Sequence, residues 1–209
     1  MEKLTLKSGS SALVVVAHPD DETIWMGGTI LKNPNLQWTI CVMTRGADKD
    51  RAPKFKKVAR YLKANGKISN LEDEGTLNIK ESIPQIKIHI NRLLDKKTFT
   101  YLFTHGYNGE YGHKRHKAVH RSLKELVSKN ELKIEQSFCF NYKTDERSKT
   151  QNMKAGDNMN GYESKLTKKE YKLKKDVIEK MYGFLRTSFE SRACLPVETF
   201  TSGFKSVRN

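Results

Sequence analysis

Near the N-terminus, one imidazole and three carboxylates fall within five consecutive residues. The run His18-Pro19-Asp20-Asp21-Glu22 directly follows a short apolar segment. Like charges this close repel one another and ionised carboxylates resist leaving water, so the arrangement is costly for stability alone. A divalent cation would relieve the repulsion. We therefore predict that His18 and Asp21 bind one metal ion, while Asp20 between them stays free to accept and release protons.

A helix cap is the alternative explanation for this run. Asp20 or Asp21 could cap the first turn of a following helix, with Glu22 interacting favourably with the helix dipole. A cap needs only one carboxylate, however, and gives no reason for the His-Pro pair. Pro19 stiffens the turn, which would hold metal ligands in place before the ion binds. The sequence therefore favours a metal site.

A second cluster contains four of the six histidines within sixteen residues: His105, His113, His116 and His120. Glycines at positions 106, 109 and 112 let the backbone turn closely around a bound group. The last three histidines share one helical face because they are spaced by three and four residues. That face alone would allow a separate three-histidine site or an ordinary polar face.

The simpler hypothesis is that the two clusters share one metal ion. Two histidines, one carboxylate and an open coordination position form the ligand set of catalytic zinc sites, whereas structural zinc sites are closed and usually use cysteines. The three cysteines, Cys41, Cys139 and Cys194, are widely spaced and contain no C-x-x-C pair. We interpret them as reduced, small hydrophobic residues, which suits a reducing compartment.

The elements that must position these residues follow a βα rhythm. Continuous apolar runs at residues 12–17, 38–44, 101–104 and 134–140 are typical of strands in a parallel sheet covered on both faces. The intervening segments predict helices over residues 21–32, 53–65, 82–94 and 113–127. This alternation predicts a Rossmann-like, doubly wound α/β fold with a mostly parallel sheet flanked by helices, in which ligand sites collect at the carboxyl ends of strands.

We expect a single domain over residues 1–209. Residues 143–162 almost lack large apolar side chains and predict a long polar loop, of the kind that can form a lid. A C-terminal helix is predicted over residues 165–186. No run approaches the roughly 18 apolar residues of a membrane-spanning helix, and the first apolar run is shorter than the roughly 7–15 residues of a signal-peptide core. We therefore predict a cytoplasmic protein without a transmembrane segment.

The net charge of +15 at pH 7 describes a protein that attracts polyanions. The basic residues are spread along the chain, as they also are on an ordinary lysine-rich surface. No zinc-finger spacing, RNA-recognition signature or basic aromatic platform accompanies the charge, so nucleic-acid binding is the less favoured hypothesis. The charge mildly favours an anionic acceptor, such as a nucleotide-sugar, a phosphoglycan or a lipid-linked sugar.

These motifs resemble those of the PIG-L/LmbE-like de-N-acetylases, a family that includes the deacetylases of N-acetylglucosaminyl-phosphatidylinositol. Residues 17–22 match the family motif A-H-P-D-D-E residue for residue, and residues 27–29 match the G-G-T that commonly follows. Residues 44–46 resemble the T-x-G after the second strand. Residues 109–120 resemble the element G-x-Y-G-H-P-D-H, so that the resemblance covers roughly residues 12–125.

The resemblance assigns a role to each of the clustered residues. It implies that His18, Asp21 and His116 are ligands of Zn²⁺. It also implies that Asp20 is the general base, and that His113 steadies the oxyanion or protonates the leaving amine.

One departure from the family pattern concerns the proton relay. The family's H-P-D-H is His113-Lys114-Arg115-His116 here, so Arg115 replaces the Asp that orients and charges the catalytic histidine. A cation beside His113 disfavours its protonated form. We predict either that another carboxylate takes over, with Glu110 as the candidate, or that His113 acts as a neutral hydrogen-bond donor.

The function implied by the resemblance is a zinc-dependent hydrolase that removes an acetyl group from an N-acetylglucosamine-type conjugate. Its products are acetate and a free amine on a small-molecule or glycoconjugate substrate. Arg51 resembles an arginine that the family uses near its substrate, although an ordinary surface arginine fits equally well. Two alternatives stay open: a zinc amidase of the same fold acting on another amide or a thiol-sugar conjugate, and a basic nucleic-acid-binding protein.

Overall fold

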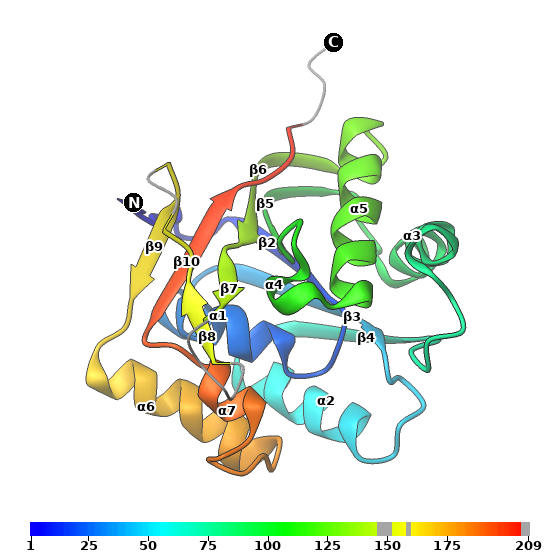
Figure 1. Cartoon of the computed structure of the whole chain (residues 1–209). Coiled ribbons are helices and arrows are strands. Elements are labelled where there is room, and N and C mark those ends of the chain that lie inside the picture. Colours follow the sequence, from blue (N-terminus) through cyan, green and yellow to red (C-terminus); the bar gives the residue numbers. More distant parts are fainter. Residues whose placement is uncertain (146–151, 158–159, 206–209) are drawn as a thin grey trace.

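An eight-stranded sheet runs through the computed structural model, which describes residues 1–145, 152–157 and 160–205 (Figure 1). In spatial order the strands are β1 (Glu2–Lys3), β9 (Tyr162–Lys165), β10 (Val197–Ser202), β6 (Lys133–Phe140), β5 (Thr98–Thr104), β2 (Ser11–Val16), β3 (Gln37–Thr44) and β4 (Asn65–Leu71). All neighbours are parallel except β10, which runs antiparallel to both β6 and β9. The predicted mostly parallel α/β fold is therefore confirmed.

The central strand β2 shows why continuous apolar runs form this sheet. Alternate side chains of a strand point to opposite faces. Ala12, Val14 and Val16 enter the hydrophobic core on one face, whereas Leu13 and Val15 enter the core on the other. All five are fully buried. Because both faces are covered, the strand needs no polar alternation.

Helices cover both faces of the sheet (Figure 1). One face carries α1 (Asp21–Lys32), α2 (Arg51–Tyr61), α6 (Lys168–Asp176) and the π-helical turn η1 (Val177–Met181), with the short α7 (Phe189–Ala193) beside them. The other face carries α3 (Ile79–Leu93) and α5 (Lys114–Ser128), which pack against each other. The short α4 (Gly109–Gly112) precedes α5. Among the described residues, no helix has both the length and the apolar character needed to cross a bilayer.

The four predicted strands and four predicted helices are present with boundaries shifted by a few residues. In this sheet, the strands missed by sequence reasoning are the two edge strands, β1 and β4, and the inner strands β9 and β10. β4 reads Asn65–Leu71, a weakly apolar run that overlaps the end of the helix predicted over residues 53–65. That helix ends earlier, at Tyr61, and Asn65 pairs with Thr39 of β3 instead.

The C-terminal half differs more from the prediction. The region predicted as a polar loop over residues 143–162 includes most of a small antiparallel pair, β7 (Tyr142–Thr144) and β8 (Met153–Ala155), while residues 146–151 and 158–159 lie outside the described part. The helix predicted over 165–186 begins at Lys168, because the preceding residues pair as β9 and Thr167 forms a capping box with Glu170. After η1 the chain turns at Gly183, whose φ is 83°.

Glu198 ties this C-terminal half to α1 and also forms a buried ion pair within it. Lys174 of α6 contacts Glu198 of β10 at 2.8 Å, and both side chains are fully buried. Glu198 also accepts hydrogen bonds from the backbone N–H groups of Gly28 and Thr29 and from the Thr29 hydroxyl. A Cβ on Gly28 would lie 2.4 Å from Leu166, so the G-G-T segment permits this close approach.

Breaking this ion pair is expected to destabilise the protein strongly. Glu198→Gln leaves Lys174 as a buried and uncompensated charge, which costs about 3–5 kcal/mol of unfolding free energy. Urea denaturation followed by circular dichroism measures the loss. Asp176→Asn, which removes only surface pairs to Lys172 and Lys180, is the matched control and should cost far less, because exposed ion pairs contribute little to stability. Equal costs for the two variants would contradict the structural role of the buried pair.

Candidate active site

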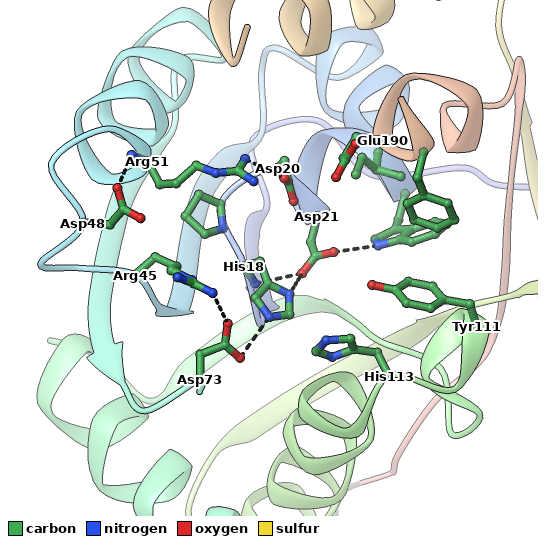
Figure 2. Close-up of a pocket in the computed structure, with 14 residues that line it drawn as sticks. His18, Asp20, Asp21, Arg45, Asp48, Arg51, Asp73, Tyr111, His113 and Glu190 are labelled. Atoms are coloured by element: carbon green, nitrogen blue, oxygen red, sulfur yellow. Dashed lines mark hydrogen bonds and ion pairs between the residues drawn. The ribbon is translucent and has the colours of Figure 1, made fainter. Parts of the chain in front are cut away.

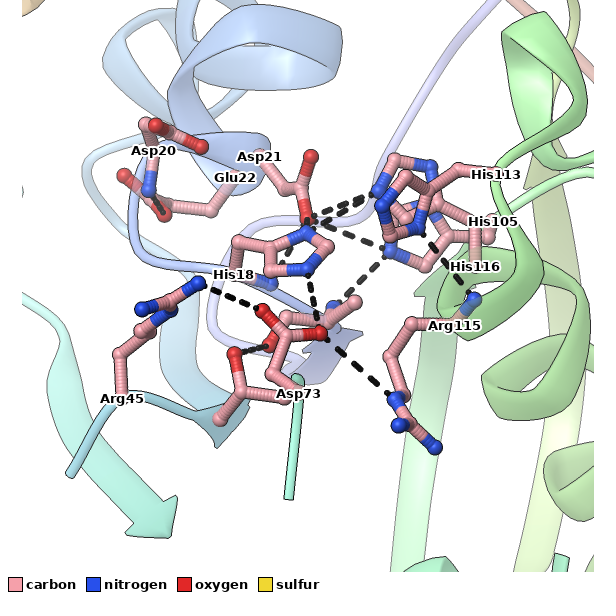
Figure 3. A network of polar contacts seen from close by, with 12 residues as sticks. His18, Asp20, Asp21, Glu22, Arg45, Asp73, His105, His113, Arg115 and His116 are labelled. Atoms are coloured by element: carbon pink, nitrogen blue, oxygen red, sulfur yellow. Dashed lines mark hydrogen bonds and ion pairs between the residues drawn. The ribbon is translucent and has the colours of Figure 1, made fainter. Parts of the chain in front are cut away.

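Both predicted clusters lie at the carboxyl edge of adjacent parallel strands. β2 ends at Val16 and leads through His18 into α1, while its neighbour β5 ends at Thr104 and leads into the His105–His116 segment. A third strand, β4, ends at Leu71 and brings Asp73 to the same edge. Figures 2 and 3 show the side chains of these three segments facing one another.

The turn between β2 and α1 holds Asp20 in an unusual backbone conformation. Its φ is 120°, a region that non-glycine residues rarely adopt and that costs on the order of 1–3 kcal/mol. The first turn of α1 stabilises this conformation, because the backbone N–H groups of Thr23 and Ile24 both donate to the Asp20 carbonyl. Backbone strain of this kind is often kept where a side chain must be aimed.

Three donor atoms from the two clusters converge on one point. His18 Nδ1 lies 3.2 Å from Asp21 Oδ2 and 3.2 Å from His116 Nε2, and His116 Nε2 lies 3.4 Å from Asp21 Oδ2. Metal–ligand bonds of about 2.0–2.1 Å in tetrahedral geometry place ligand atoms about 3.3–3.4 Å apart. The three atoms are therefore spaced as ligands of one tetrahedral ion, with the fourth position left to a non-protein ligand.

His105 lies beside this triangle, but its hydrogen bonds exclude it from the ligand set. Its Nε2 accepts the Ala17 backbone N–H at 2.9 Å, and its Nδ1 lies 2.9 Å from Glu110 Oε2. The ring is therefore a neutral tautomer with its proton on Nδ1, and its one lone pair is already occupied. His105 packs against His116 with ring centroids 3.8 Å apart and supports that ring.

Glu110 orients His116. Its Oε2 lies 2.5 Å from His116 Nδ1, which fixes the proton there and leaves the Nε2 lone pair facing the triangle. Burial raises the pKa of Glu110, but the neighbouring His105 and His116 outweigh burial and lower it to about 2. Glu110 contacts these two histidines rather than His113, so the idea that Glu110 replaces the family's Asp beside His113 is wrong. The loop between His105 and Glu110 can pass close to β6 because residue 106 is a glycine. A Cβ there would lie 2.5 Å from the Phe140 carbonyl oxygen.

His113 is oriented by the backbone instead. It caps α5, and its Nδ1 accepts the Arg115 backbone N–H at 3.3 Å. The proton of the neutral ring is therefore on Nε2. Burial and the neighbouring His116 and His18 lower the pKa of His113 to about 3. In the pocket, the His113 ring lies edge-on to the His18 ring, with ring centroids 4.7 Å apart. The neutral His113 ring can donate a hydrogen bond through its N–H group, but it does not act as an acid.

Sequence reasoning missed Asp73, which orients the other histidine of the triangle. Its Oδ1 lies 3.2 Å from His18 Nε2, so the second nitrogen of His18 also faces a carboxylate (Figure 3). Two arginines contact Asp73, Arg45 at 3.2 Å and Arg115 at 3.7 Å. Arg115, which replaces the family's Asp, thus turns away from His113 toward the Asp73 loop, where it also pairs with Glu72 at 3.1 Å. The signal that could have revealed Asp73 is the acidic run after β4, had that strand been recognised.

The remaining carboxylates of the first cluster differ in their surroundings. Burial and the charge of Asp21 raise the pKa of Asp20 well above its ordinary value. Arg51 reaches from α2 and pairs with Asp20 at 3.0 Å. Glu22 points away into the core, where it accepts hydrogen bonds from the Tyr182 hydroxyl and the Asp20 backbone. Asp20 is therefore the carboxylate of the run that faces the pocket without belonging to the triangle.

The triangle opens into a cavity of about 340 Å³ (Figure 2). Trp25, Tyr111 and Phe189 form an aromatic wall, with Tyr111 and Phe189 ring centroids 5.0 Å apart. Asp20, His18 and His113 line the polar side together with carboxylates and arginines of the surrounding loops. A substrate in this cavity would contact the triangle, a carboxylate of raised pKa and a neutral imidazole N–H at once.

Comparison with known families shows where this chain belongs. The model of the PIG-L family, described as GlcNAc-PI de-N-acetylase, matches residues 13–127, which is more than half of the chain and includes every residue of the triangle. The chain belongs to the PIG-L family.

Individual relatives of this PIG-L protein are distant. It is 28% identical over 134 residues to the uncharacterised protein L374 of Acanthamoeba polyphaga mimivirus, and the match covers 56% of this chain but only 58% of the viral protein. In structure it is similar to the A40926 pseudoaglycone deacetylase Dbv21, with a TM-score of 0.69, 12% identity and coverage of 97% of this chain and all of the other. It is also similar to the N,N′-diacetylchitobiose deacetylase of Pyrococcus horikoshii, with a TM-score of 0.62, 16% identity and coverage of 92% and 83%. At these identities the likeness establishes the shared fold.

Metal binding by this PIG-L protein is expected to weaken as the pH falls. Burial disfavours the charged form of His18, but its contacts with Asp21 and Asp73 outweigh burial and raise its pKa to about 10. At neutral pH the metal-free chain therefore holds a proton on His18 that an ion must displace, whereas the pKa values of Asp21 and His116 are lowered, leaving both deprotonated. Affinity for Zn²⁺ should fall about tenfold for each unit that the pH drops from 8 to 6. Calorimetric titration with Zn²⁺ in one buffer at pH 8 and another at pH 6 tests this prediction. An affinity that does not depend on pH would contradict it.

The orienting role of Asp73 predicts a specific loss of metal affinity. Asp73→Asn removes the carboxylate from His18 Nε2 and should weaken Zn²⁺ binding by about 10–100-fold. Competition with a chelating dye measures this affinity. Glu74→Gln is the control, because Glu74 lies next in the loop, is 79% exposed and contacts Arg45 rather than a histidine. Equal affinities of the Asp73 variant and the control would refute the orienting role.

Proposed function

We propose that the protein is a zinc-dependent hydrolase that removes the acetyl group from an N-acetylglucosamine-type sugar, giving acetate and a free amine. One observation carries the proposal: His18, Asp21 and His116 present three donor atoms at tetrahedral spacing next to a carboxylate, Asp20, that is not one of them. Membership of a family of de-N-acetylases supports the same chemistry.

The donor set fits zinc rather than a harder cation. Two imidazole nitrogens and one carboxylate oxygen are typical of catalytic zinc, whereas magnesium and calcium prefer oxygen ligands throughout. Each imidazole also contacts a carboxylate through its other nitrogen, as metal-binding histidines usually do. When bound here, zinc would supply Lewis acidity that polarises the acetamide carbonyl and makes water a stronger acid.

Asp20 is proposed as the general base. Its raised pKa makes it a stronger base than an ordinary aspartate, and Arg51 at 3.0 Å keeps one of its oxygens in place. Asp20 takes a proton from the attacking water as the oxygen–carbon bond forms. It returns that proton to the nitrogen as the carbon–nitrogen bond breaks, so one carboxyl group serves both steps.

His113 is proposed to stabilise the oxyanion. Its Nε2–H faces the pocket because Nδ1 is occupied by the Arg115 backbone N–H. A preorganised donor at this position stabilises the negative charge that develops on the carbonyl oxygen. The lowered pKa of His113 leaves its charged form unpopulated at neutral pH, so proton delivery to the amine is assigned to Asp20.

Asp20→Asn is expected to abolish turnover while stabilising the fold. Loss of the base should lower acetate release from N-acetylglucosamine substrates by at least about 100-fold, with zinc content unchanged. Because folding raises the pKa of Asp20, its ionised form destabilises the protein at neutral pH. Removing that charge should raise the melting temperature of the metal-free protein, and asparagine also tolerates the positive φ.

The stabilisation expected for Asp20→Asn should depend on pH. The stabilisation by a neutral Asp20 is fully present below the unfolded pKa of about 4 and is lost as the pH rises through the folded pKa. The advantage of Asp20→Asn over wild type should therefore shrink toward pH 4. Asp50→Asn, an exposed aspartate paired with Lys54, is the control and should leave activity unchanged. Near wild-type acetate release by Asp20→Asn would show that the general-base assignment is wrong.

A further inference from the structure

The pocket does not share the positive charge of the whole protein. Five carboxyl side chains and two guanidinium groups line it: Asp20, Asp21, Asp48, Asp73, Glu190, Arg45 and Arg51. Both arginines are already paired, Arg51 with Asp20 and Arg45 with Asp73 and Glu74. Within the described part of the chain, no lysine lines the pocket. Even with a divalent cation bound, the pocket has no surplus positive charge to offer a phosphate.

Two carboxylates of this pocket, Asp48 and Glu190, take no part in the proposed deacetylation chemistry. Asp48 already accepts the backbone N–H groups of Asp50 and Arg51. Glu190 is the other. It belongs to α7, outside the segment matched by the family model, and it lines the pocket (Figure 2). Across the described residues it makes neither a hydrogen bond nor an ion pair. Glu190 also contributes, after burial and the charges of Asp21, Asp20 and Glu110, to the raised pKa of Tyr111. Glu190 is therefore an acceptor on the pocket wall whose side chain has no partner among the described residues.

The aromatic wall complements this acceptor. Tyr111 is 38% exposed and Phe189, next to Glu190 in sequence, packs against it at 5.0 Å. The apolar C–H face of a sugar ring can lie on such rings, while its hydroxyl groups point away from them. An ionised carboxylate accepts hydrogen bonds and donates none, so it suits hydroxyl or amine groups and repels phosphate oxygens.

We propose that the acceptor is an uncharged acetamido sugar and that Glu190 is a specificity-determining residue. Glu190 accepts hydrogen bonds from the sugar's hydroxyl groups and discriminates against phosphorylated sugars. This inference rests on the proposed deacetylase function and narrows its substrate class. The expectation of an anionic acceptor came from the total charge of the chain, and that charge lies on other surfaces than this pocket.

Acetate release by the zinc-loaded protein tests the proposal on matched substrates. The neutral probe is methyl N-acetyl-β-glucosaminide, and the anionic probes are the 1-phosphate and the 6-phosphate of N-acetylglucosamine. Wild type should favour the neutral probe by at least about tenfold in kcat/KM, since like charges in a binding site disfavour the wrong ligand. Glu190→Gln should narrow this preference, and Glu190→Lys should reverse it, mainly through KM.

The control variant is Glu131→Gln. Glu131 precedes β6, at the amino ends of the parallel strands and away from the pocket. It is 40% exposed and contacts Lys87, so its loss changes the net charge without changing the pocket. Its substrate preference should equal that of wild type. A wild-type preference for a phosphorylated probe, or an unchanged preference in Glu190→Lys, would overturn the inference and leave the deacetylase proposal standing.

A binding measurement separates the two proposals when turnover is absent. The zinc-loaded wild type is titrated calorimetrically with methyl N-acetyl-β-glucosaminide and with N-acetylglucosamine 6-phosphate. If no probe releases acetate, the proposed function is wrong. In that case tighter binding of the neutral sugar still supports the inference, and equal or tighter binding of the phosphorylated sugar overturns it.

Discussion

The organisation of this protein depends on burying imidazoles and carboxylates together without leaving any of them unpaired. A lone buried charge is costly, and removal of one partner leaves the other uncompensated. The fold meets this constraint by giving each triangle histidine two acidic contacts. His116 lies between Asp21 and Glu110, and His18 lies between Asp21 and Asp73. Each ring thereby has one nitrogen directed at the point where the three donors meet and the other facing a carboxylate.

The replacement of the family's Asp by Arg115 is understandable within the same constraint. In this chain the backbone N–H of Arg115 orients His113, so no carboxylate is needed beside that ring. The Arg115 guanidinium instead joins Arg45 in balancing the acidic loop after β4. The departure removes a charged partner from one histidine and adds support to the loop that orients another.

The family core and the C-terminal half contribute different parts of the site. The core supplies the triangle, Asp20 and His113, which follow β2 and β5, and Asp73, which follows β4. The C-terminal half supplies Phe189 and Glu190 on the pocket wall, and it is coupled to α1 because Glu198 accepts hydrogen bonds from Gly28 and Thr29 of that helix. Since α1 begins at Asp21, the same helix connects the turn that carries His18 and Asp20 to the segment that shapes the pocket.

Several features were determined by the sequence alone because they depend on local patterns. Continuous apolar runs predicted the central strands, and the Ala17–Glu22 motif located one half of the site, with the histidines after β5 as the other half. The strands β1, β4, β9 and β10, the contacts of Arg115, and the positions of Asp73 and Glu190 at the pocket were decided only by tertiary structure. These residues act through contacts with segments far away in the chain, and the pairing of a charge is a property of its neighbours in space. For the same reason, a net charge counted over the whole sequence does not describe the charge inside the pocket.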